Sequence, residues 1–367
     1  MTQPLSLKMG RAAMRALFKE KSPLGPLKVM AKHVGRFFQI PLPMFKPYVV
    51  FGPEAVRKVL ITERHKVLWR NTDPVTDLLD RGVLIVDGDE HDHYRKLMEP
   101  PLHPARLPDY TQMMISQTDR VTSQWQNGQT VDMLIESRKI ALLIIMRTLF
   151  SKDAWDDLPR IWNPILKAIE YISPGVWIIW RNMPRFGFRK PLRDLDEYLF
   201  EIINDRRRQT EDRLSSTVYG QNDLLQHLVD AGLTDKVIRD QMLTMLIAGH
   251  DTSTALLAWI FALLGQHPET HEQLLHEVDA QEKSALLDHV IKESLRLYPP
   301  IHIGNRRIAE EMDFDGNKIP KDERLFYSIY LTHRDPEIWE NAEDFCPERF
   351  AHGRKTPPMS YIPFGGG

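Results

Sequence analysis

The residues best suited to chemistry interrupt an apolar segment at 246–257, where Gly249, Asp251 and Thr252 stand among leucine, isoleucine and alanine. The pattern predicts one helix from 235 to about 266, because the apolar residues continue on both sides of the interruption. A glycine inside a helix costs about 1 kcal/mol relative to alanine, so we expect a compensating role. A ligand could approach the backbone there, and the neighbouring acid and hydroxyl could pass protons. A buried helix with a packing glycine explains the same residues, and this segment alone leaves both interpretations open.

A second predicted helix ends before Pro299 and Pro300, because a residue that precedes proline disfavours helical backbone angles. Its charged pair, Glu293 and Arg296, falls opposite the apolar stripe at a spacing that allows the two side chains to touch. Exposed pairs of this kind are common and contribute only about 0.3–0.5 kcal/mol. Further along, Phe364-Gly-Gly-Gly367 predicts a loop whose backbone approaches another group closely.

Taken in this order, these segments resemble the cytochrome P-450 family of haem-thiolate monooxygenases, and the resemblance runs from about residue 47 to the end. Each match is a short motif at a place where the family has a functional segment. The matches are Ala248-Gly249-His250-Asp251-Thr252 for the oxygen-binding helix, Glu293-Ser-Leu-Arg296 for the K helix, Pro347-Glu-Arg349-Phe for the following segment, Phe364 to Gly367 for the opening of the haem-binding loop, and His91-Asp-His-Tyr-Arg95 for the C helix.

The resemblance implies haem as the cofactor and O₂ as a substrate. It implies that Ala248 and Gly249 widen the helix groove for oxygen. Thr252 would hold the oxygen-derived ligand or a water, and Asp251 would connect it to solvent, because the chemistry needs two protons on this side of the haem.

The resemblance also implies roles in binding haem and in holding the fold. His91 and Arg95 would bind one haem propionate, and Arg307 the other, with Arg306 left open as the alternative. Phe364 and Gly367 would line the haem-binding loop. The cluster of Glu293, Arg296 and Arg349 would be structural, with its side chains buried and hydrogen-bonded to one another.

One departure from the family pattern concerns the iron ligand. The family loop reads Phe-x-x-Gly-x-Arg-x-Cys-x-Gly, and this sequence ends at the first glycine of that pattern, Gly367. The single cysteine, Cys346, precedes Pro-Glu-Arg-Phe and is interpreted as a small apolar filler. We therefore expect no metal ligand in this chain, and a C-terminally incomplete copy that lacks the ligand cysteine, the following helix and the closing hairpin.

The expected fold is mainly α-helical with small β-sheets, as in the cytochrome P-450 fold. We divide the chain into an N-terminal segment, 1–46, and an incomplete cytochrome P-450 domain, 47–367. Strands are expected at 48–51 and near 325–327, and the Asp315-Gly316 pair predicts a hairpin.

The composition limits the classes of molecule that this protein is expected to bind. The net charge of −2 does not favour binding to nucleic acid, which is itself negatively charged. The single cysteine suits a reducing compartment such as the cytoplasm. No segment reads as a transmembrane anchor. The basic amphipathic stretch at 7–17 could touch a membrane surface, although a docked peripheral helix is the preferred interpretation. The resemblance implies a small hydrophobic substrate and an external ferredoxin- or flavodoxin-type electron donor, and the aromatic stretch at 175–189 falls where the family has its lid.

Two other functions are compatible with parts of this sequence. The chain could be a non-catalytic remnant that acts as a helical binding protein or has no function, because descent from an enzyme does not guarantee activity. A non-haem metal hydrolase would use His91, Asp92 and His93, but the sequence offers no second ligand group nearby.

Overall fold

The computed structural model forms two compact units, which are described separately. The first unit contains Met1–Arg70 and Trp259–Gly367, and the second contains Asn71–Ala258. The residues that the structure describes are 7–41, 45–69, 74–173, 184–213, 223–279, 284–351 and 356–365.

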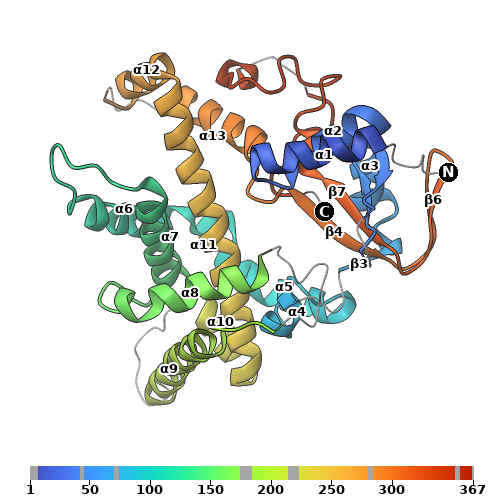
Figure 1. Ribbon diagram of the computed structural model, residues 1–367. Coiled ribbons are helices and arrows are strands. Elements are labelled where there is room, and N and C mark those ends of the chain that lie inside the picture. The colour runs from blue at the N-terminus through green and yellow to red at the C-terminus, as the bar shows by residue number, and fades with distance from the viewer. Residues whose placement is uncertain are drawn as a thin grey trace. The chain divides into compact units, whose positions relative to one another are not determined.

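A five-stranded sheet forms the centre of the first unit (Figure 1). Its strands follow the order β1-β2-β7-β4-β3, and only the β2–β7 pair is parallel. Buried residues such as Val50, Ile308 and Leu325 form the core against it. The bounds are β1 (Phe37–Gln39), β2 (Tyr48–Val50), β3 (Val67–Leu68), β4 (Ile303–Ile308) and β7 (Arg324–Ser328).

A separate two-stranded hairpin joins β5 (Met312–Phe314) to β6 (Asn317–Ile319). The two turn residues, Asp315 and Gly316, have φ angles of 53° and 83°. Two consecutive left-handed residues are what a tight type I′ turn requires, and Asp-Gly supplies them at low cost. The strands expected at 48–51, around Asp315-Gly316 and near 325–327 are therefore confirmed.

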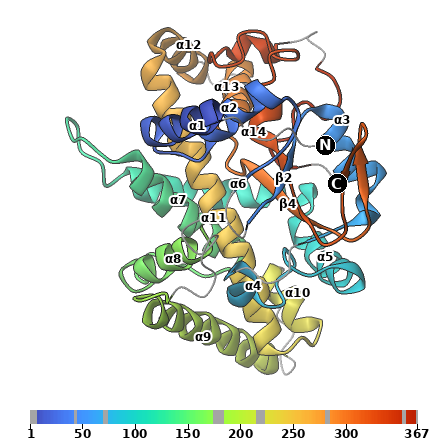
Figure 2. The same ribbon diagram turned by 45° about the vertical axis from the view of Figure 1, so that its right-hand side comes forward.

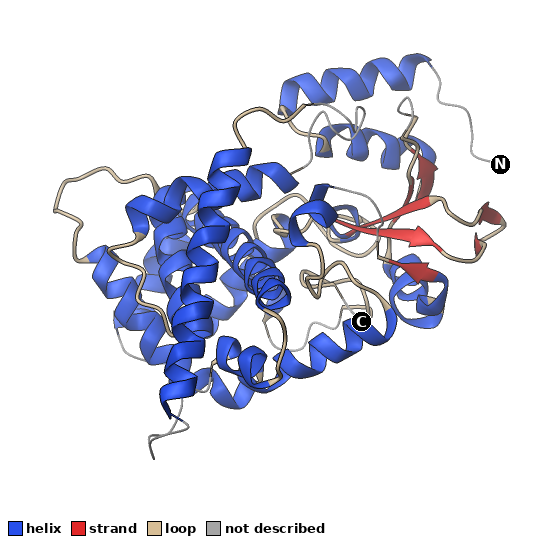
Figure 3. Cartoon of the chain, turned by 90° about the horizontal axis from the view of Figure 1, so that it is seen from below, coloured by secondary structure: helices blue, strands red, loops and turns tan. Residues whose placement is uncertain are grey.

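Two helices of the first unit, α2 and α14, contact the sheet, whose strands Figure 3 draws in red. Helix α1 packs against α2 (Figure 2), and α2 in turn contacts β1. Since β1 pairs with β2, the segment before residue 47 packs in the same unit as the strand that follows it. The bounds are α1 (Leu7–Glu20), α2 (Leu24–Val34), α3 (Pro53–Arg57), α12 (Pro268–Asp279), α13 (Ala285–Leu297) and α14 (Ile329–Thr332), with short non-α turns at Lys58–Thr62, Arg64–Lys66 and Pro347–Phe350.

The described residues of the second unit form helices joined by turns and loops, with no strand among them. Its core gathers large apolar side chains such as Leu142, Met146, Ile165 and Leu199, all nearly inaccessible to solvent. The bounds are α4 (Pro74–Leu79), α5 (Gly88–Leu102), α6 (Leu107–Thr122), α7 (Met133–Phe150), α8 (Leu158–Ile172), α9 (Arg189–Arg213), α10 (Leu224–Asp230) and α11 (Asp235–Gln266), with a 3₁₀ turn at Pro104–Arg106.

Helix α11 begins where the sequence predicts it and continues into the first unit. The Thr234 hydroxyl accepts from the Val237 N–H at 3.4 Å, as an N-cap does. Among the described helices, α11 is long and apolar enough to cross a membrane by length and composition, a test that core helices also pass. Its Arg239 is ion-paired with Asp196 and Asp240, which fits a core helix. The mainly helical fold with small sheets is thus confirmed.

Candidate functional site

Glu293 on α13 is the centre of a buried charge cluster in the first unit. Its carboxylate accepts from Arg296 Nε at 2.7 Å and Nη2 at 2.8 Å, and from Arg349 Nε at 2.9 Å. It also accepts from the backbone N–H of Cys346 at 2.9 Å. All three charged side chains are buried. The pair on α13 is therefore far from the solvated surface bridge that is common at this spacing.

The remaining donors of the two arginines bind backbone carbonyls. Arg296 donates to three carbonyl oxygens at 2.7–3.1 Å, and Arg349 donates to two at 3.0–3.3 Å. These carbonyls lie between residues 333 and 344, so the cluster fixes the path of an irregular segment. Because one carboxylate faces two guanidinium groups, the five carbonyl dipoles supply the additional negative potential that the burial demands. They belong to His333, Ala342, Asp344, Glu340 and Asn341.

His333 extends this cluster toward the C-terminal loop, a role that the sequence did not indicate. The Ile362 N–H donates to His333 Nε2 at 2.8 Å, so Nδ1 carries the proton and donates to the Arg296 carbonyl at 3.2 Å. Burial lowers the pKa of His333 to about 3, so the ring is neutral near pH 7. The neutral ring thereby ties the segment before Phe364 to the end of α13.

The polar turn of α11 is built differently. Thr252 Oγ1 donates to the Ala248 carbonyl one turn back at 2.7 Å. A Cβ placed on Gly249 would lie 3.1 Å from Cδ1 of Ile145, a side chain of α7. Close packing against α7 therefore accounts for the absence of a side chain at Gly249 on that side of the helix.

Asp251 lies beside Thr252, partly exposed to solvent. Desolvation by the surrounding protein raises the pKa of its carboxyl, and the positive charge of Arg138 on α7 opposes part of that rise. A carboxyl whose pKa is raised above the ordinary value of an aspartate is better suited to take up and release a proton near neutral pH.

The neighbouring His250 points toward α7. A carbonyl oxygen only accepts hydrogen bonds, so His250 Nε2 carries the proton and donates to the Arg138 carbonyl at 3.1 Å. Burial lowers the pKa of His250 to about 4, which makes the ring neutral. Its Nδ1 atom is then a buried acceptor with no partner among the described residues. The buried hydroxyls of Ser137 and Thr254 and the N–H donor at Arg138 Nε also have no partner there.

The two predicted propionate ligands on α5 lie on one side of that helix. His91 is half-buried and its Nδ1 lies 3.0 Å from Asp92 Oδ1, while Arg95, four residues on, is exposed. His93 is exposed and its ring contacts that of Tyr94. Among the described residues, no group of three histidine, cysteine, aspartate or glutamate side chains is arranged to hold a metal ion. The hydrolase alternative therefore gains no support from this helix.

The structure separates Arg306 from its neighbour Arg307 on β4. Arg307 Nη1 pairs with Asp322 at 3.1 Å near the protein surface. The guanidinium of Arg306 instead lies over two aromatic rings, 4.9 Å from the centroid of Trp69 and 5.4 Å from that of Tyr327. Because side chains alternate along a strand, the two arginines occupy opposite faces, and the sequence offered no way to choose between them.

The C-terminal loop and Cys346 complete the predicted residues. Phe364 is 86% exposed, and Gly367 lies outside the described residues. The Cys346 thiol donates to Glu348 at 3.4 Å, and desolvation raises its pKa. A raised pKa disfavours the thiolate that binds iron, which agrees with the interpretation of Cys346 as a filler. The aromatic stretch at 175–189 falls largely outside the described residues.

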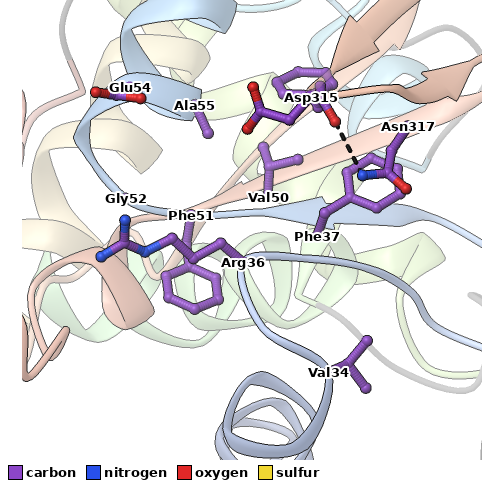
Figure 4. A pocket seen from close by; sticks show the side chains of 11 residues that line it. Val34, Arg36, Phe37, Val50, Phe51, Gly52, Glu54, Ala55, Asp315 and Asn317 are labelled. Atoms are coloured by element: carbon purple, nitrogen blue, oxygen red, sulfur yellow. Dashed lines mark hydrogen bonds between the residues drawn. The ribbon is translucent and has the colours of Figure 1, made fainter. Parts of the chain in front are cut away.

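A separate pocket of about 350 Å³ opens in the first unit between β1, β2 and the β5–β6 hairpin (Figure 4). Arg36 lies at its edge, but its guanidinium already pairs with Asp335 and Glu337. The pocket contains none of the predicted site residues.

Comparisons with known proteins agree with these features. The family model of cytochrome P-450 matches residues 14–367. Cyclooctat-9-en-7-ol 5-monooxygenase of Streptomyces melanosporofaciens is 29% identical, over 95% of this chain and 80% of its own length. Pentalenene oxygenase of Streptomyces avermitilis is 26% identical, over 95% of this chain and 81% of its own length.

A solved structure, retinoic acid bound cyanobacterial CYP120A1, matches with a TM-score of 0.80 and 25% identity, over 93% of this chain and 81% of that one. The motifs occur in the family's order, and the fold and the family model agree over almost the whole chain. This chain belongs to the cytochrome P-450 family, and its function is that of a haem-dependent monooxygenase.

Proposed function

We propose that this monooxygenase inserts one oxygen atom from O₂ into a small hydrophobic alkene or alkenol. Judged by their names, one relative named above acts on cyclooctat-9-en-7-ol and another on pentalenene. The solved relative holds retinoic acid. All three are predominantly apolar molecules, and such ligands suit the apolar cavities in which proteins bind small molecules.

The observation that carries the chemical role is the pairing of Asp251 and Thr252 on one turn of α11. Asp251 reaches solvent and has a raised pKa, so it can collect a proton from water. The Thr252 hydroxyl donates a hydrogen bond to the Ala248 carbonyl. Its oxygen lone pairs can therefore accept a hydrogen bond from a water or a protonated ligand. Together the two side chains would carry protons from solvent to the oxygen side of the cofactor.

The residues that would hold haem are basic, small or, at Phe364, aromatic. His91, Arg95 and Arg306 would bind its carboxylates, with Arg306 in place of Arg307 because Arg307 is already ion-paired. Ala248, Gly249, Phe364 and Gly367 would line the cofactor. Haem with a thiolate ligand supplies reductive activation of O₂. Cys346 does not suit the ligand position, because its thiol is hydrogen-bonded beside the Glu293 cluster.

The electrons would come from a ferredoxin- or flavodoxin-type donor, and the chain would work in the cytoplasm, where its one cysteine stays reduced. Both assignments extend what the family establishes, namely a need for substrate, O₂ and a redox partner.

The substrate class is tested by supplying ¹⁸O₂, pentalenene or cyclooctat-9-en-7-ol, and either donor with its reductase to the full-length, haem-loaded protein. We expect one ¹⁸O atom in the product. Thr252→Ala should keep haem and substrate binding but divert electrons to hydrogen peroxide, whereas Thr252→Ser, which retains the hydroxyl, should stay coupled. Equal coupling in both variants would contradict the proton role, and the absence of any labelled product would contradict the substrate class.

The ligand assignment is tested on residues 1–367 loaded with haem. The reduced carbon-monoxide complex should lack the red-shifted Soret band of thiolate ligation, and Cys346→Ser should leave its spectrum unchanged. A red-shifted band that disappears in Cys346→Ser would identify Cys346 as the ligand and overturn the assignment.

A further inference from the structure

Helix α1 has one face docked on the protein and one face open to solvent. Met9 is buried, and Ala13, Ala16 and Leu17 are half-buried on the docked side. The contact with α2 is close, since a Cβ on Gly25 would lie 3.0 Å from the Ala16 carbonyl oxygen. The docked-helix interpretation therefore accounts for this face and leaves the opposite face to be explained.

The open face carries positive charge without any acid. Its exposed positions recur at the spacing of a single helix face, and four of them are basic. The only carboxylate of the helix, Glu20, lies at its last residue, where it pairs with Lys28 of α2 at 3.5 Å. Apart from Glu20, the exposed positions of the helix are Lys8, Arg11, Met14, Arg15, Phe18 and Lys19, which we call the basic face of α1.

The same face exposes two large apolar side chains one turn apart. Met14 is 52% exposed and Phe18 is 73% exposed. Single exposed apolar residues are ordinary on protein surfaces. Here, however, the pair stands beside four cations on a helix whose other side is already packed, so both features face the same direction.

We propose that the basic face of α1 docks the protein in the plane of an anionic phospholipid bilayer. Lysine and arginine would lie at the headgroups, while Phe18 and Met14 would enter the boundary of the acyl chains, as in interfacial amphipathic helices. An acidic protein partner would be attracted by the same cations, but it would leave unexplained why the apolar pair stands beside them. This inference is independent of the proposed substrate and needs neither haem nor turnover.

The overall charge makes the proposal specific. The whole chain carries a net charge of −2, so an anionic membrane would not attract it through bulk electrostatics. Binding to such a membrane must then arise from a local surface, and salt should weaken it because exposed charges are screened.

The test uses residues 1–367 and unilamellar vesicles, either phosphatidylcholine alone or phosphatidylcholine mixed with phosphatidylglycerol, separated by flotation. We expect binding to the mixed vesicles at least about tenfold tighter than to phosphatidylcholine, and lost at high salt. Arg11→Glu with Arg15→Glu should abolish this preference, and Phe18→Ser should weaken binding to both kinds of vesicle.

Two control variants keep the result specific to α1. Lys190→Glu with Arg193→Glu reverses two exposed cations on α9, and Ile115→Ser removes an exposed apolar side chain from α6. Both should bind like the parent. Circular dichroism spectra identical to the parent would show that each variant is folded.

Several outcomes would overturn the proposal. Equal binding to the two kinds of vesicle would do so, as would an equal loss of binding in the α9 variant. Binding that responds to Arg11 and Arg15 but not to Phe18 would mean that the face attracts anions without entering lipid, as expected for an acidic protein partner.

Discussion

Two polar regions of this protein, the Glu293 cluster in one unit and the polar turn of α11 in the other, treat their buried hydrogen-bonding groups in opposite ways. Around Glu293, every nitrogen of the two guanidinium groups donates to a carboxylate or a carbonyl oxygen. Around His250, four buried polar atoms have no partner among the described residues.

The difference distinguishes residues that stabilise the fold from residues that could take part in the reaction. A fully satisfied buried network stabilises one arrangement of the chain, because each broken bond would leave a charge or dipole uncompensated. A buried polar group without a protein partner costs free energy and persists where it has another use, such as binding water or carrying protons. The first region therefore belongs to the scaffold, and the second lies beside Asp251 and Thr252, the proposed proton carriers.

The largest loss of stability is expected when the Glu293 cluster loses its carboxylate. Glu293→Ala would leave two buried guanidinium groups without a counter-charge and should lower the free energy of unfolding by about 3–5 kcal/mol or more. Asp288→Ala removes an exposed carboxylate that pairs with Lys292 on the same helix, and should cost at most about 0.5 kcal/mol. Urea unfolding of the two variants gives the comparison, and similar losses would show that burial of the cluster is not what matters.

A second effect should appear in the pH dependence of stability. His250 and His333 have pKa values lowered to about 4 and about 3, below the 6.5 of an unperturbed histidine. As the pH falls below 6.5, these histidines become protonated in the unfolded chain but remain neutral in the folded protein. Stability that is present above pH 6.5 should therefore be lost toward pH 4, by up to about 1.4 kcal/mol per pH unit for each histidine.

This pH effect can be assigned to one residue. His250→Gln keeps a side-chain N–H for the Arg138 carbonyl but does not titrate. The slope of unfolding free energy against pH between about 6.5 and 5 should become shallower in this variant. An unchanged slope would mean that His250 is not a buried neutral group.

The smallest change in stability is expected from substituting two buried threonines on α11, which differ in their hydrogen bonding. Thr244 Oγ1 donates to the Asp240 carbonyl at 2.6 Å, whereas Thr254 Oγ1 has no partner among the described residues. Thr244→Val should cost about 1 kcal/mol, while Thr254→Val should be neutral or slightly stabilising, because it removes an unsatisfied group. Thermal unfolding distinguishes the two, and a larger loss for Thr254→Val would show that its hydroxyl is satisfied in solution.

Much of the fold follows from local sequence patterns. The bounds of α11 and the Asp315-Gly316 turn were predictable because N-caps, apolar periodicity and left-handed turn residues act within a few positions. Local patterns did not predict the burial of Arg296, since its carbonyl partners lie 37–48 residues further along the chain, and only the family resemblance implied it.

The candidate site shows the same limit. The motifs predict Asp251 and Thr252 as site residues and the Glu293 cluster as structural, but the choice between Arg306 and Arg307 depends on which face of β4 carries the aromatic rings. The structural use of His333 depends on Ile362, a contact that no local pattern encodes.

The separation of scaffold from chemistry is tested most directly by Arg296→Ala and Thr252→Ala, made side by side in the full-length protein. The measurement is haem content per protein together with the urea midpoint of unfolding. We predict that Arg296→Ala loses haem incorporation and folding, because Glu293 loses two of its four hydrogen bonds and three carbonyl oxygens lose their donor. Thr252→Ala should keep the haem content of the parent and a free energy of unfolding within about 1 kcal/mol of it. A folded, haem-replete Arg296→Ala protein would contradict the account.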